Sequence, residues 1–401
     1  MRTPRLWDRI EGMLLGLAIG DSLGNTTEGL LPDQRAQRYG TIRDYLPNPR
    51  AENRPVGLPS EYTQLAMWTL EQLLADKGLV PDHLARRFCQ QWIFRVSRTL
   101  REFIRRYKDE QVPWERAGVA SAGNGALARI APILVPHLQQ PSPALWADVA
   151  LAAMLIHNDP ASIGSCLALE RLLWEVMGLS SVPDPRWWVD HFCSTLHPLE
   201  GEATYETRSP HVPYRGPLWL FVEARVPRAV SDGLSVRDAC DWWHSGAYLM
   251  ETVPSALFIL ARFAHDPEEA IVRAVNDTKD NDSIAAIVGA VVGALHGRSG
   301  LPARWIDGLL GRTDAADDGQ VFELALKATG GTVCRVDELR PDDILTSVDN
   351  VRPGDTVFFV RQADHEVELR ALSQAHRKAF TGIRYRVVQG DEPGSILFTL
   401  E

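Results

Sequence analysis

Cysteine, long apolar runs and positive charge are all scarce in this sequence. Its 401 residues include only five cysteines, which lie far apart and form no Cys-x-x-Cys pair. This spacing disfavours a disulfide framework. We therefore expect reduced, mostly buried thiols, as in a protein of a reducing compartment.

No stretch is long and apolar enough to suggest a membrane span. The longest apolar run near the end of the helical part is Ile284–Leu295, which contains Gly289 and Gly293. At about 12 residues it is too short to cross a bilayer and suits a buried helix. The charged N-terminal segment lacks the apolar region and cleavage site of a secretory signal. We expect a soluble, cytoplasmic protein that does not bind membranes.

Positive charge is in deficit over the whole chain. Lysine and arginine total 42 against 52 aspartates and glutamates, a formal net charge of −10. Proteins that bind nucleic acid concentrate positive charge on one face. We expect no general nucleic-acid-binding surface.

Helical periodicity dominates the first ~325 residues. Apolar residues recur at three- and four-residue spacing in segments such as Leu65–Leu74, Leu84–Val96 and Ile163–Met177, which predicts helices. After Gly330-Gly331 the pattern changes to short segments rich in Val, Ile, Phe and Tyr, separated by turn residues. The fold class predicted is all-α over 1–328, followed by a small β-rich C-terminal domain over 332–401.

Three clusters of small and acidic residues stand out in the helical part. In the first, Gly12, Gly16 and Gly20 fall at four-residue steps, which predicts close packing of one helix face. Close packing does not account for Asp21 beside them, since a buried carboxylate needs a cation or several donors. Asp21 is therefore either a site residue or a satisfied core residue.

The other two clusters lie at predicted helix starts. Ser60-Glu61-Tyr62-Thr63 precedes an apolar helical segment, so it is either a simple helix cap or a set of oxygens that converge on a cation. Asn276–Ser283 holds three aspartates directly ahead of the buried Ile284–Leu295 helix. Clustered carboxylates repel one another unless a cation or protons neutralise them. Such oxygen ligands suit Mg²⁺, Mn²⁺ or Ca²⁺ rather than zinc.

In this order along the chain, the clusters resemble the motifs of the ADP-ribosylglycohydrolase family. Gly16–Gly24 with Glu28 beyond it is similar to the opening motif, and Asp280–Ala290 is similar to the closing Asp-x-Asp-[Ser/Thr] motif with its buried helix. Three further segments resemble motifs between these two. They are Ser121–Arg129 with its Gly-Asn-Gly loop, Ile156–Pro160 with its histidine, and Gly246–Pro254.

The resemblance implies an enzyme that hydrolyses the glycosidic bond between ADP-ribose and an acceptor, often arginine, with one or two Mg²⁺ or Mn²⁺ ions. Its substrate would be an ADP-ribosylated protein or a small molecule that contains ADP-ribose. Position by position it implies catalytic roles for Glu28 and Asp21. It also implies diphosphate or substrate contacts from Gly123, Asn124, Gly125 and His157, and metal ligation by Ser60, Glu61, Asp280, Asp282 and Ser283.

One motif departs from the family pattern. Where the family has Thr-Asp-Asp-Thr, this chain has Ser60-Glu61-Tyr62-Thr63. Tyr62 removes a carboxylate, because a phenol is neutral at pH 7 and is a poor Mg²⁺ ligand. An alternative hypothesis is therefore a catalytically impaired protein that binds ADP-ribose or a nucleotide. A third hypothesis is that the C-terminal module docks a protein partner.

Overall fold

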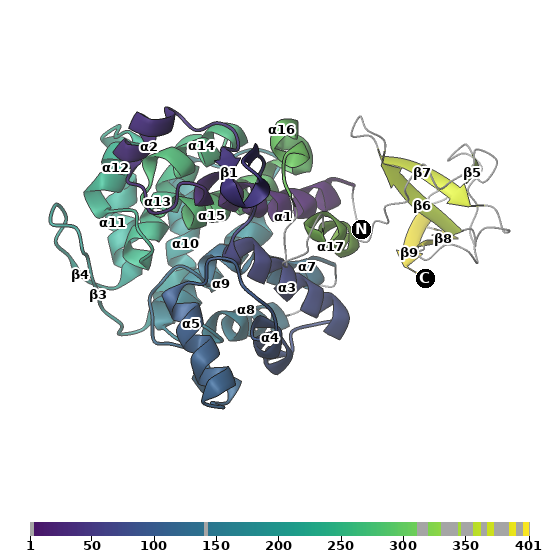
Figure 1. The fold of residues 1–401 in the computed structure, drawn as a ribbon, viewed down its shortest axis with the longest axis horizontal. Helices are drawn as coiled ribbons and strands as arrows, with labels where there is room; N and C mark the ends of the chain where they lie inside the picture. The colour runs from purple at the N-terminus through teal and green to yellow at the C-terminus, as the bar shows by residue number, and fades with distance from the viewer. Residues whose placement is uncertain are drawn as a thin grey trace. The chain divides into compact units, whose positions relative to one another are not determined.

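A computed structural model describes residues 4–139, 143–310 and 320–329, and strands within 344–400. The chain divides into two compact units, Met1–Val321 and Phe322–Glu401. The first unit is a helical body (Figure 1), as predicted. No helix among the described residues is both long and apolar enough to cross a membrane.

Most of the described residues of the first unit are helical. Among them, four short strands pair as β1 (Pro47–Asn48) with β2 (Arg54–Pro55) and β3 (Tyr205–Glu206) with β4 (Arg215–Gly216). The α-helices are α1 (Pro4–Asn25), α2 (Pro32–Tyr39), α3 (Glu61–Asp76), α4 (Pro81–Phe88), α5 (Arg98–Ile104), α6 (Trp114–Ala117), α7 (Leu134–Gln139), α8 (Ala144–Met154), α9 (Pro160–Val176), α10 (Pro185–Glu200), α11 (Leu218–Ser231), α12 (Val236–Trp243), α13 (Leu249–Phe263), α14 (Pro267–Asp277), α15 (Asn281–His296), α16 (Ala303–Asp307) and, at the boundary of the units, α17 (Gln320–Thr329). Single 3₁₀ turns are η1 (Pro49–Ala51), η3 (Leu127–Arg129), η4 (Ala131–Ile133) and η5 (Arg298–Gly300), and η2 (Arg105–Asp109) is a π-helical turn.

The centre of the helical body is an antiparallel contact between α1 and α15. A methyl group at Gly16 would overlap the carbonyl oxygen of Gly289, and one at Gly20 would overlap that of Ala285. The two backbones are therefore in direct contact along these helices. This confirms the close packing predicted from the four-residue glycine spacing, and it brings the end of α1 beside the start of α15.

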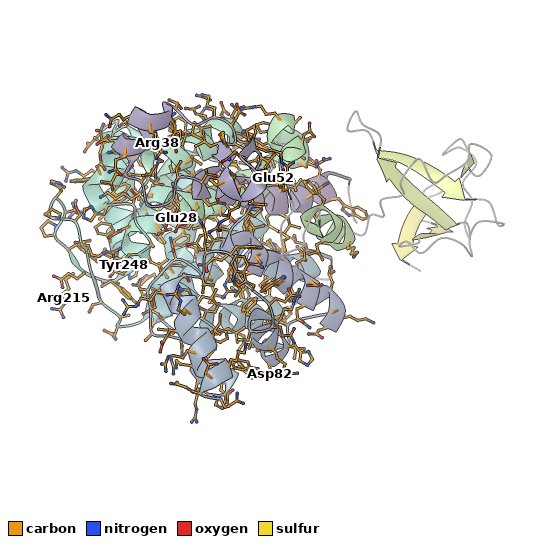
Figure 2. All side chains as sticks on the ribbon, in the orientation of Figure 1. Glu28, Arg38, Glu52, Asp82, Arg215 and Tyr248 are labelled. Atoms are coloured by element: carbon orange, nitrogen blue, oxygen red, sulfur yellow. The ribbon has the colours of Figure 1, made fainter. Side chains whose placement is uncertain are left out.

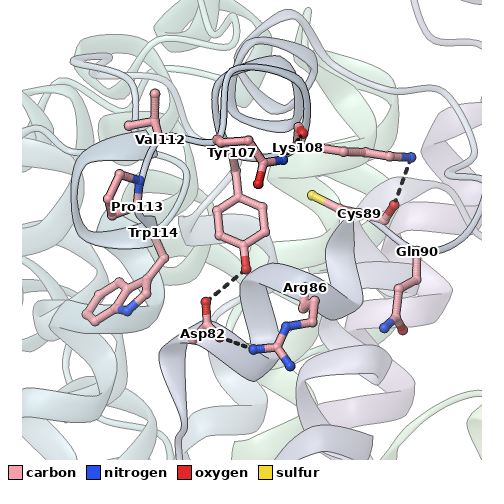
Figure 3. Close-up of a pocket in the computed structure, with 10 residues that line it drawn as sticks. Asp82, Arg86, Cys89, Gln90, Tyr107, Lys108, Val112, Pro113 and Trp114 are labelled. Carbon is pink, nitrogen blue, oxygen red and sulfur yellow. Dashed lines mark hydrogen bonds and ion pairs between the residues drawn. The ribbon is translucent and has the colours of Figure 1, made fainter.

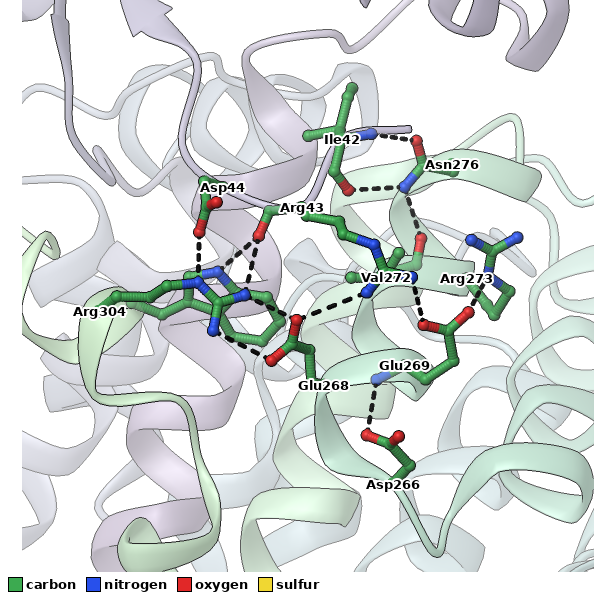
Figure 4. Close-up of polar contacts among 11 residues, drawn as sticks. Ile42, Arg43, Asp44, Asp266, Glu268, Glu269, Val272, Arg273, Asn276 and Arg304 are labelled. Atoms are coloured by element: carbon green, nitrogen blue, oxygen red, sulfur yellow. Dashed lines mark hydrogen bonds and ion pairs between the residues drawn. The ribbon is translucent and has the colours of Figure 1, made fainter. Parts of the chain in front are cut away.

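Hydrogen bonds and ion pairs hold the segment after α2 against α14 (Figure 4). Asn276 Nδ2 donates to the carbonyl oxygen of Ile42 at 2.9 Å, and the Ile42 amide donates to Asn276 Oδ1 at 2.8 Å. Arg43 pairs with Glu269 at 2.8 Å, and Arg304 of α16 pairs with Glu268 at 2.7 Å. The side-chain pairs are partly exposed and each contributes little to stability, but together with the Asn276 amide they fix the path of the chain.

One predicted helix is wrong in extent. The apolar spacing of Leu84–Val96 predicts a continuous helix, but α4 ends at Phe88 and a loop follows. The loop is held from outside: Phe94 N donates to Gln64 Oε1, and Gln64 Nε2 donates to the carbonyl oxygen of Trp92, both at 3.0 Å. Long-range partners for the loop backbone have replaced the local hydrogen bonds of a helix.

In the second unit the described residues beyond α17 form an antiparallel sheet in the order β5-β7-β6-β8-β9. The predicted β-rich domain over 332–401, and the boundary drawn at 328, stay predictions, because the segments between these strands lie outside the described part of the chain. The strands are β5 (Ile344–Leu345), β6 (Thr356–Arg361), β7 (Val367–Leu372), β8 (Tyr385–Gln389) and β9 (Ile396–Leu400).

The contact between α1 and α15 gives a direct test of the fold. Gly16→Ala should lower the free energy of unfolding by about 3 kcal/mol or more, because the added methyl meets backbone that cannot move aside cheaply. Gly178→Ala is the control, since a methyl there meets nothing closer than 3.4 Å. Equal urea-denaturation midpoints for the two variants would contradict direct backbone contact at Gly16.

Candidate active site

The end of α1 and the start of α15 form the floor of the candidate site. Asn281 Nδ2 donates to the carbonyl oxygen of Gly24 at 2.9 Å and to Thr27 Oγ1 at 3.0 Å. The backbone of Asp282 lies against Gly24 so closely that no side chain fits there. Glu28 follows in the next turn (Figure 2) and is half exposed. The opening and closing motifs are thus adjacent in space.

The Asp21 carboxylate accepts hydrogen bonds at the start of α3. Its Oδ2 accepts hydrogen bonds from the amides of Ser60 at 2.9 Å and Thr63 at 3.1 Å, and from Thr63 Oγ1 at 2.6 Å. Asn25 Nδ2 donates to its Oδ1 at 3.2 Å. The buried carboxylate thus supplies the cap that α3 lacks locally. These contacts tie Asp21 to the start of α3, and the catalytic role implied by the resemblance stays a prediction.

Asp280 and Ser283 are joined to the Gly-Asn-Gly loop by Asn124. Asn124 Nδ2 lies 2.6 Å from Asp280 Oδ2, 2.8 Å from Ser283 Oγ and 2.9 Å from Thr252 Oγ1. Ser283 Oγ also donates to Asp280 Oδ2. The structure therefore brings together one predicted substrate-binding residue and two predicted metal ligands.

Asp282 is the most deeply buried carboxylate of the closing motif. Its Oδ1 accepts a hydrogen bond from the Ser283 amide at 2.9 Å. Burial raises the pKa of Asp282 well above its ordinary value, and the nearby charges of Asp280, Glu28 and Asp21 raise it further. The predicted acidic cluster is therefore present at the α15 start, where burial and the neighbouring carboxylates disfavour the charged form of Asp282.

Glu61 contacts Ser97, the residue directly before α5. Its Oε2 accepts a hydrogen bond from the Ser97 amide at 2.7 Å. Burial raises the pKa of Glu61 to about 8 despite that bond, and the charges of Glu28 and Asp21 add to the rise. The hydroxyl of neighbouring Ser60 is buried and has no hydrogen-bond partner.

Tyr62 faces the acidic cluster. Burial raises the pKa of its phenol well above the ordinary value, and the charges of Asp280 and Asp282 raise it further. The side chain that replaces a family carboxylate is therefore a neutral phenol in the electrostatic field of the closing motif.

The described residues do not fit a pair of bound cations. No group of three or more His, Cys, Asp or Glu side chains in the described part of the chain has an arrangement that could hold a metal ion. Asn124 donates to Asp280 Oδ2 and the Ser97 amide to Glu61 Oε2, so one oxygen of each carboxylate is shared with a protein donor. The Ser60 hydroxyl is buried without a hydrogen-bond partner, and a hydroxyl alone binds Mg²⁺ poorly.

The glycines of the Gly-Asn-Gly loop make room for His157. A methyl at Gly125 would lie 3.0 Å from His157 Cε1, and one at Gly123 would lie 3.3 Å from Nε2. Burial lowers the pKa of His157 to about 3, with Arg129 adding to the effect, so the imidazole is neutral. The Gly123 amide donates to Ser121 Oγ, and the Asn124 amide to a backbone carbonyl. Two of the three amides expected to bind a diphosphate therefore have protein acceptors.

Sequence reasoning missed the strained turn that positions Asp280. His244 and Ser245 both have positive φ, at 88° and 50°. The carbonyl oxygen of Ser245 accepts hydrogen bonds from the amides of Asp280 at 2.9 Å and Lys279 at 3.2 Å. Such backbone strain is concentrated at functional sites. No composition or spacing signal marks this turn, although it directly precedes the Gly246–Pro254 motif.

Arg95 was also missed, because Leu84–Val96 was predicted to be one helix. In the loop that replaces the helix end, Arg95 Nη1 lies 2.5 Å from Glu28 Oε2. Burial raises the pKa of Glu28, Arg95 opposes that rise, and Asp280 and Asp21 add to it. Glu28 is thus connected electrostatically to the acidic cluster on one side and to Arg95 on the other.

A separate cavity of about 490 Å³ lies between α4 and the segment after α5 (Figure 3). Tyr107 donates to Asp82 at 2.8 Å, and Arg86 also pairs with Asp82 there. None of the residues implied by the family motifs lines this cavity.

Comparison with known proteins agrees with the arrangement of these motifs. The sequence profile of the ADP-ribosylglycohydrolase family matches residues 2–332. The chain is 26% identical over 320 residues to ADP-ribosyl-[dinitrogen reductase] glycohydrolase of Rhodospirillum rubrum, covering 77% of this chain and 92% of that protein. It is also 26% identical over 316 residues to ADP-ribosylarginine hydrolase Tri1 of Pseudomonas putida, covering 75% and 74%.

A solved structure described as an ADP-ribosylglycohydrolase-related protein complex has the same fold. It aligns with a TM-score of 0.60 at 25% identity and covers 82% of this chain and 99% of its own. The chain therefore belongs to the ADP-ribosylglycohydrolase family, a family of hydrolases that act on ADP-ribose linkages.

The raised pKa of Glu61 predicts a pH-dependent stability. The carboxyl titrates near 4.5 when unfolded and near 8 when folded, so its protonated form stabilises the fold below pH 4.5 and this stabilisation is lost as the pH rises through 8. Glu61→Gln keeps an acceptor for Ser97 without the charge. In EDTA at pH 9 the free energy of unfolding of Glu61→Gln should exceed that of the parent by roughly 2–4 kcal/mol. At pH 5 the free energies of unfolding of the two proteins should agree within about 1 kcal/mol.

The matched control for this urea titration is Glu115→Gln, at an exposed position. It should track the parent at both pH values. A Glu61→Gln variant that is no more stable than the parent at pH 9 would show that Glu61 ionises without cost in the folded protein.

The departure at residues 61 and 62 predicts weak binding of divalent cations. Calorimetric titration with Mn²⁺ should show at most one weak site in the parent chain. Glu61→Asp combined with Tyr62→Asp should bind Mn²⁺ at least ~10-fold more tightly, because it restores a fourth carboxylate to the site. Two tight sites in the parent, unchanged in the double variant, would contradict this account of Tyr62.

Proposed function

We propose that this chain hydrolyses the glycosidic bond between ADP-ribose and an acceptor on an ADP-ribosylated protein or small molecule, with arginine as the acceptor. The observation that carries the proposal is the convergence of Glu28, Asp280 and Asp282 where the α1 end meets the α15 start. The name of the Pseudomonas relative supports arginine.

The chemistry of the acidic cluster suits this reaction. Breaking the bond to the anomeric carbon builds positive charge on the ribose ring. Carboxylates fixed around that position stabilise the developing charge without reorganising. Asn124, at 2.6 Å, and Ser283 both donate to Asp280 Oδ2, which holds this carboxyl at the start of α15.

Glu28 is the group best placed to move a proton. It is half exposed, and its pKa is raised by burial and by neighbouring carboxylates, as suits a general base. Water adds to the anomeric carbon as the carbon–nitrogen bond breaks, and Glu28 accepts the proton that the water loses. That proton then passes to the departing guanidine nitrogen, which restores the carboxylate.

A second candidate function is binding of ADP-ribose or a related nucleotide without hydrolysis. Tyr62 favours it, because a neutral phenol replaces a carboxylate beside Asp280 and Asp282. On this second proposal the small β-rich C-terminal domain, residues 332–401, docks a protein partner, and Mg²⁺ or Mn²⁺ is not required.

Activity of Glu28 variants separates the two candidates. With an ADP-ribosylated arginine substrate, Glu28→Gln should lower kcat at least ~100-fold, while calorimetry should show binding of free ADP-ribose within a few-fold of the parent. Glu52→Gln, which changes an exposed carboxylate, should keep full activity. A parent that binds ADP-ribose but releases none from arginine, serine or nucleotide linkages would favour the second candidate.

A further inference from the structure

Arg95 presents a guanidinium at the edge of the proposed active site. Its Nη1 lies 2.5 Å from Glu28 Oε2 and also donates to the carbonyl oxygen of Asn25. One nitrogen of the guanidinium is therefore bound by the proposed base and by the backbone at the end of α1.

The loop that carries Arg95 is fixed by the same helix that begins at the site. Gln64 of α3 holds the loop backbone at Trp92 and Phe94, and Glu61 accepts a hydrogen bond from the Ser97 amide. These contacts bracket Arg95 on both sides. Arg95 itself has φ of 61°, a conformation that costs free energy for a residue with a side chain. The surrounding contacts thus impose this placement on the loop.

The place that Arg95 occupies is suited to a planar cation. A carboxylate and a carbonyl oxygen meet one nitrogen, and a guanidinium NH2 group can donate to both. The carboxyl groups of Asp280 and Asp21 also lie close enough to raise the pKa of Glu28. In the proposed reaction the glycosidic nitrogen of the acceptor guanidinium lies beside Glu28. The acceptor guanidinium therefore needs the same two oxygens, Glu28 Oε2 and the carbonyl oxygen of Asn25.

We propose that the Arg95 side chain competes with the acceptor for one position. Its guanidinium fills the acceptor position beside Glu28 and the Asn25 carbonyl oxygen, and the side chain moves out when an acceptor guanidinium enters. The proposal rests on the proposed function for the identity of the acceptor. Arg95 is then a specificity-determining residue, because an acceptor that carries no N–H donor cannot replace the contacts that Arg95 gives up.

The first test asks whether a free guanidinium compound binds more tightly once the Arg95 guanidinium has been removed. Arg95→Ala and Arg95→Gly both delete the guanidinium, and glycine also relieves the positive φ, so a shared effect reports the guanidinium rather than the backbone. Calorimetric titration with methylguanidine should show binding at least ~10-fold tighter to both variants than to the parent. Arg98→Ala removes a charge from an exposed residue three positions along and should behave as the parent.

The kinetic test uses an ADP-ribosylated arginine substrate, for which both Arg95 variants should have a KM about 3- to 10-fold lower than that of the parent. A raised KM would overturn the proposal, because Arg95 would then hold substrate, and so would equal methylguanidine binding by parent and variants. Tighter methylguanidine binding by the variants together with no hydrolysis by any form would support the proposal for Arg95 and contradict the proposed function.

Discussion

Direct backbone contact between α1 and α15 is the constraint on which the site depends. Glycines at four-residue steps let the helices approach until the carbonyl oxygens of one touch the other. Because the helices are antiparallel, this contact aligns the end of α1 with the start of α15. Glu28 and the Asp280–Ser283 motif meet there although more than 250 residues separate them in the sequence.

The carboxylates at this junction accept hydrogen bonds from the protein. Asp21 accepts from the start of α3, Asp280 from Asn124 and Ser283, and Glu61 from the Ser97 amide. These donors hold each carboxylate in place, while burial disfavours the charged form and raises the pKa values of Asp282 and Glu61. A cation placed there would favour the charged form of these carboxylates, and Arg95 already lies at the edge of the region.

The fold of the helical part could be predicted from sequence because its signals are local. Apolar periodicity predicted helical segments now found in α3 and α9, and glycine spacing predicted the contact of α1 with its neighbour. The end of α4 could not be predicted, because the loop after it is held by Gln64, a partner more than 20 residues away in the sequence. Local patterns do not contain that information.

The candidate site, like the fold, could be predicted only in part. Motif order placed Asp280, Asp282, Ser283 and Asn124 together, but it could not show which oxygen each donor occupies. The catalytic role of Asp21 and the metal ligation by Glu61 stay predictions. The sequence could not show that Asp21 accepts hydrogen bonds at the start of α3 or that Glu61 accepts one from Ser97. Both contacts join elements distant in sequence.

The most direct test of the central claim is a crystal structure of this chain with ADP-ribose. The account predicts electron density for the terminal ribose beside Glu28, Asp280 and Asp282, at the junction of α1 and α15. Ribose density in the cavity between α4 and the segment after α5, with the acidic cluster left unchanged, would contradict it.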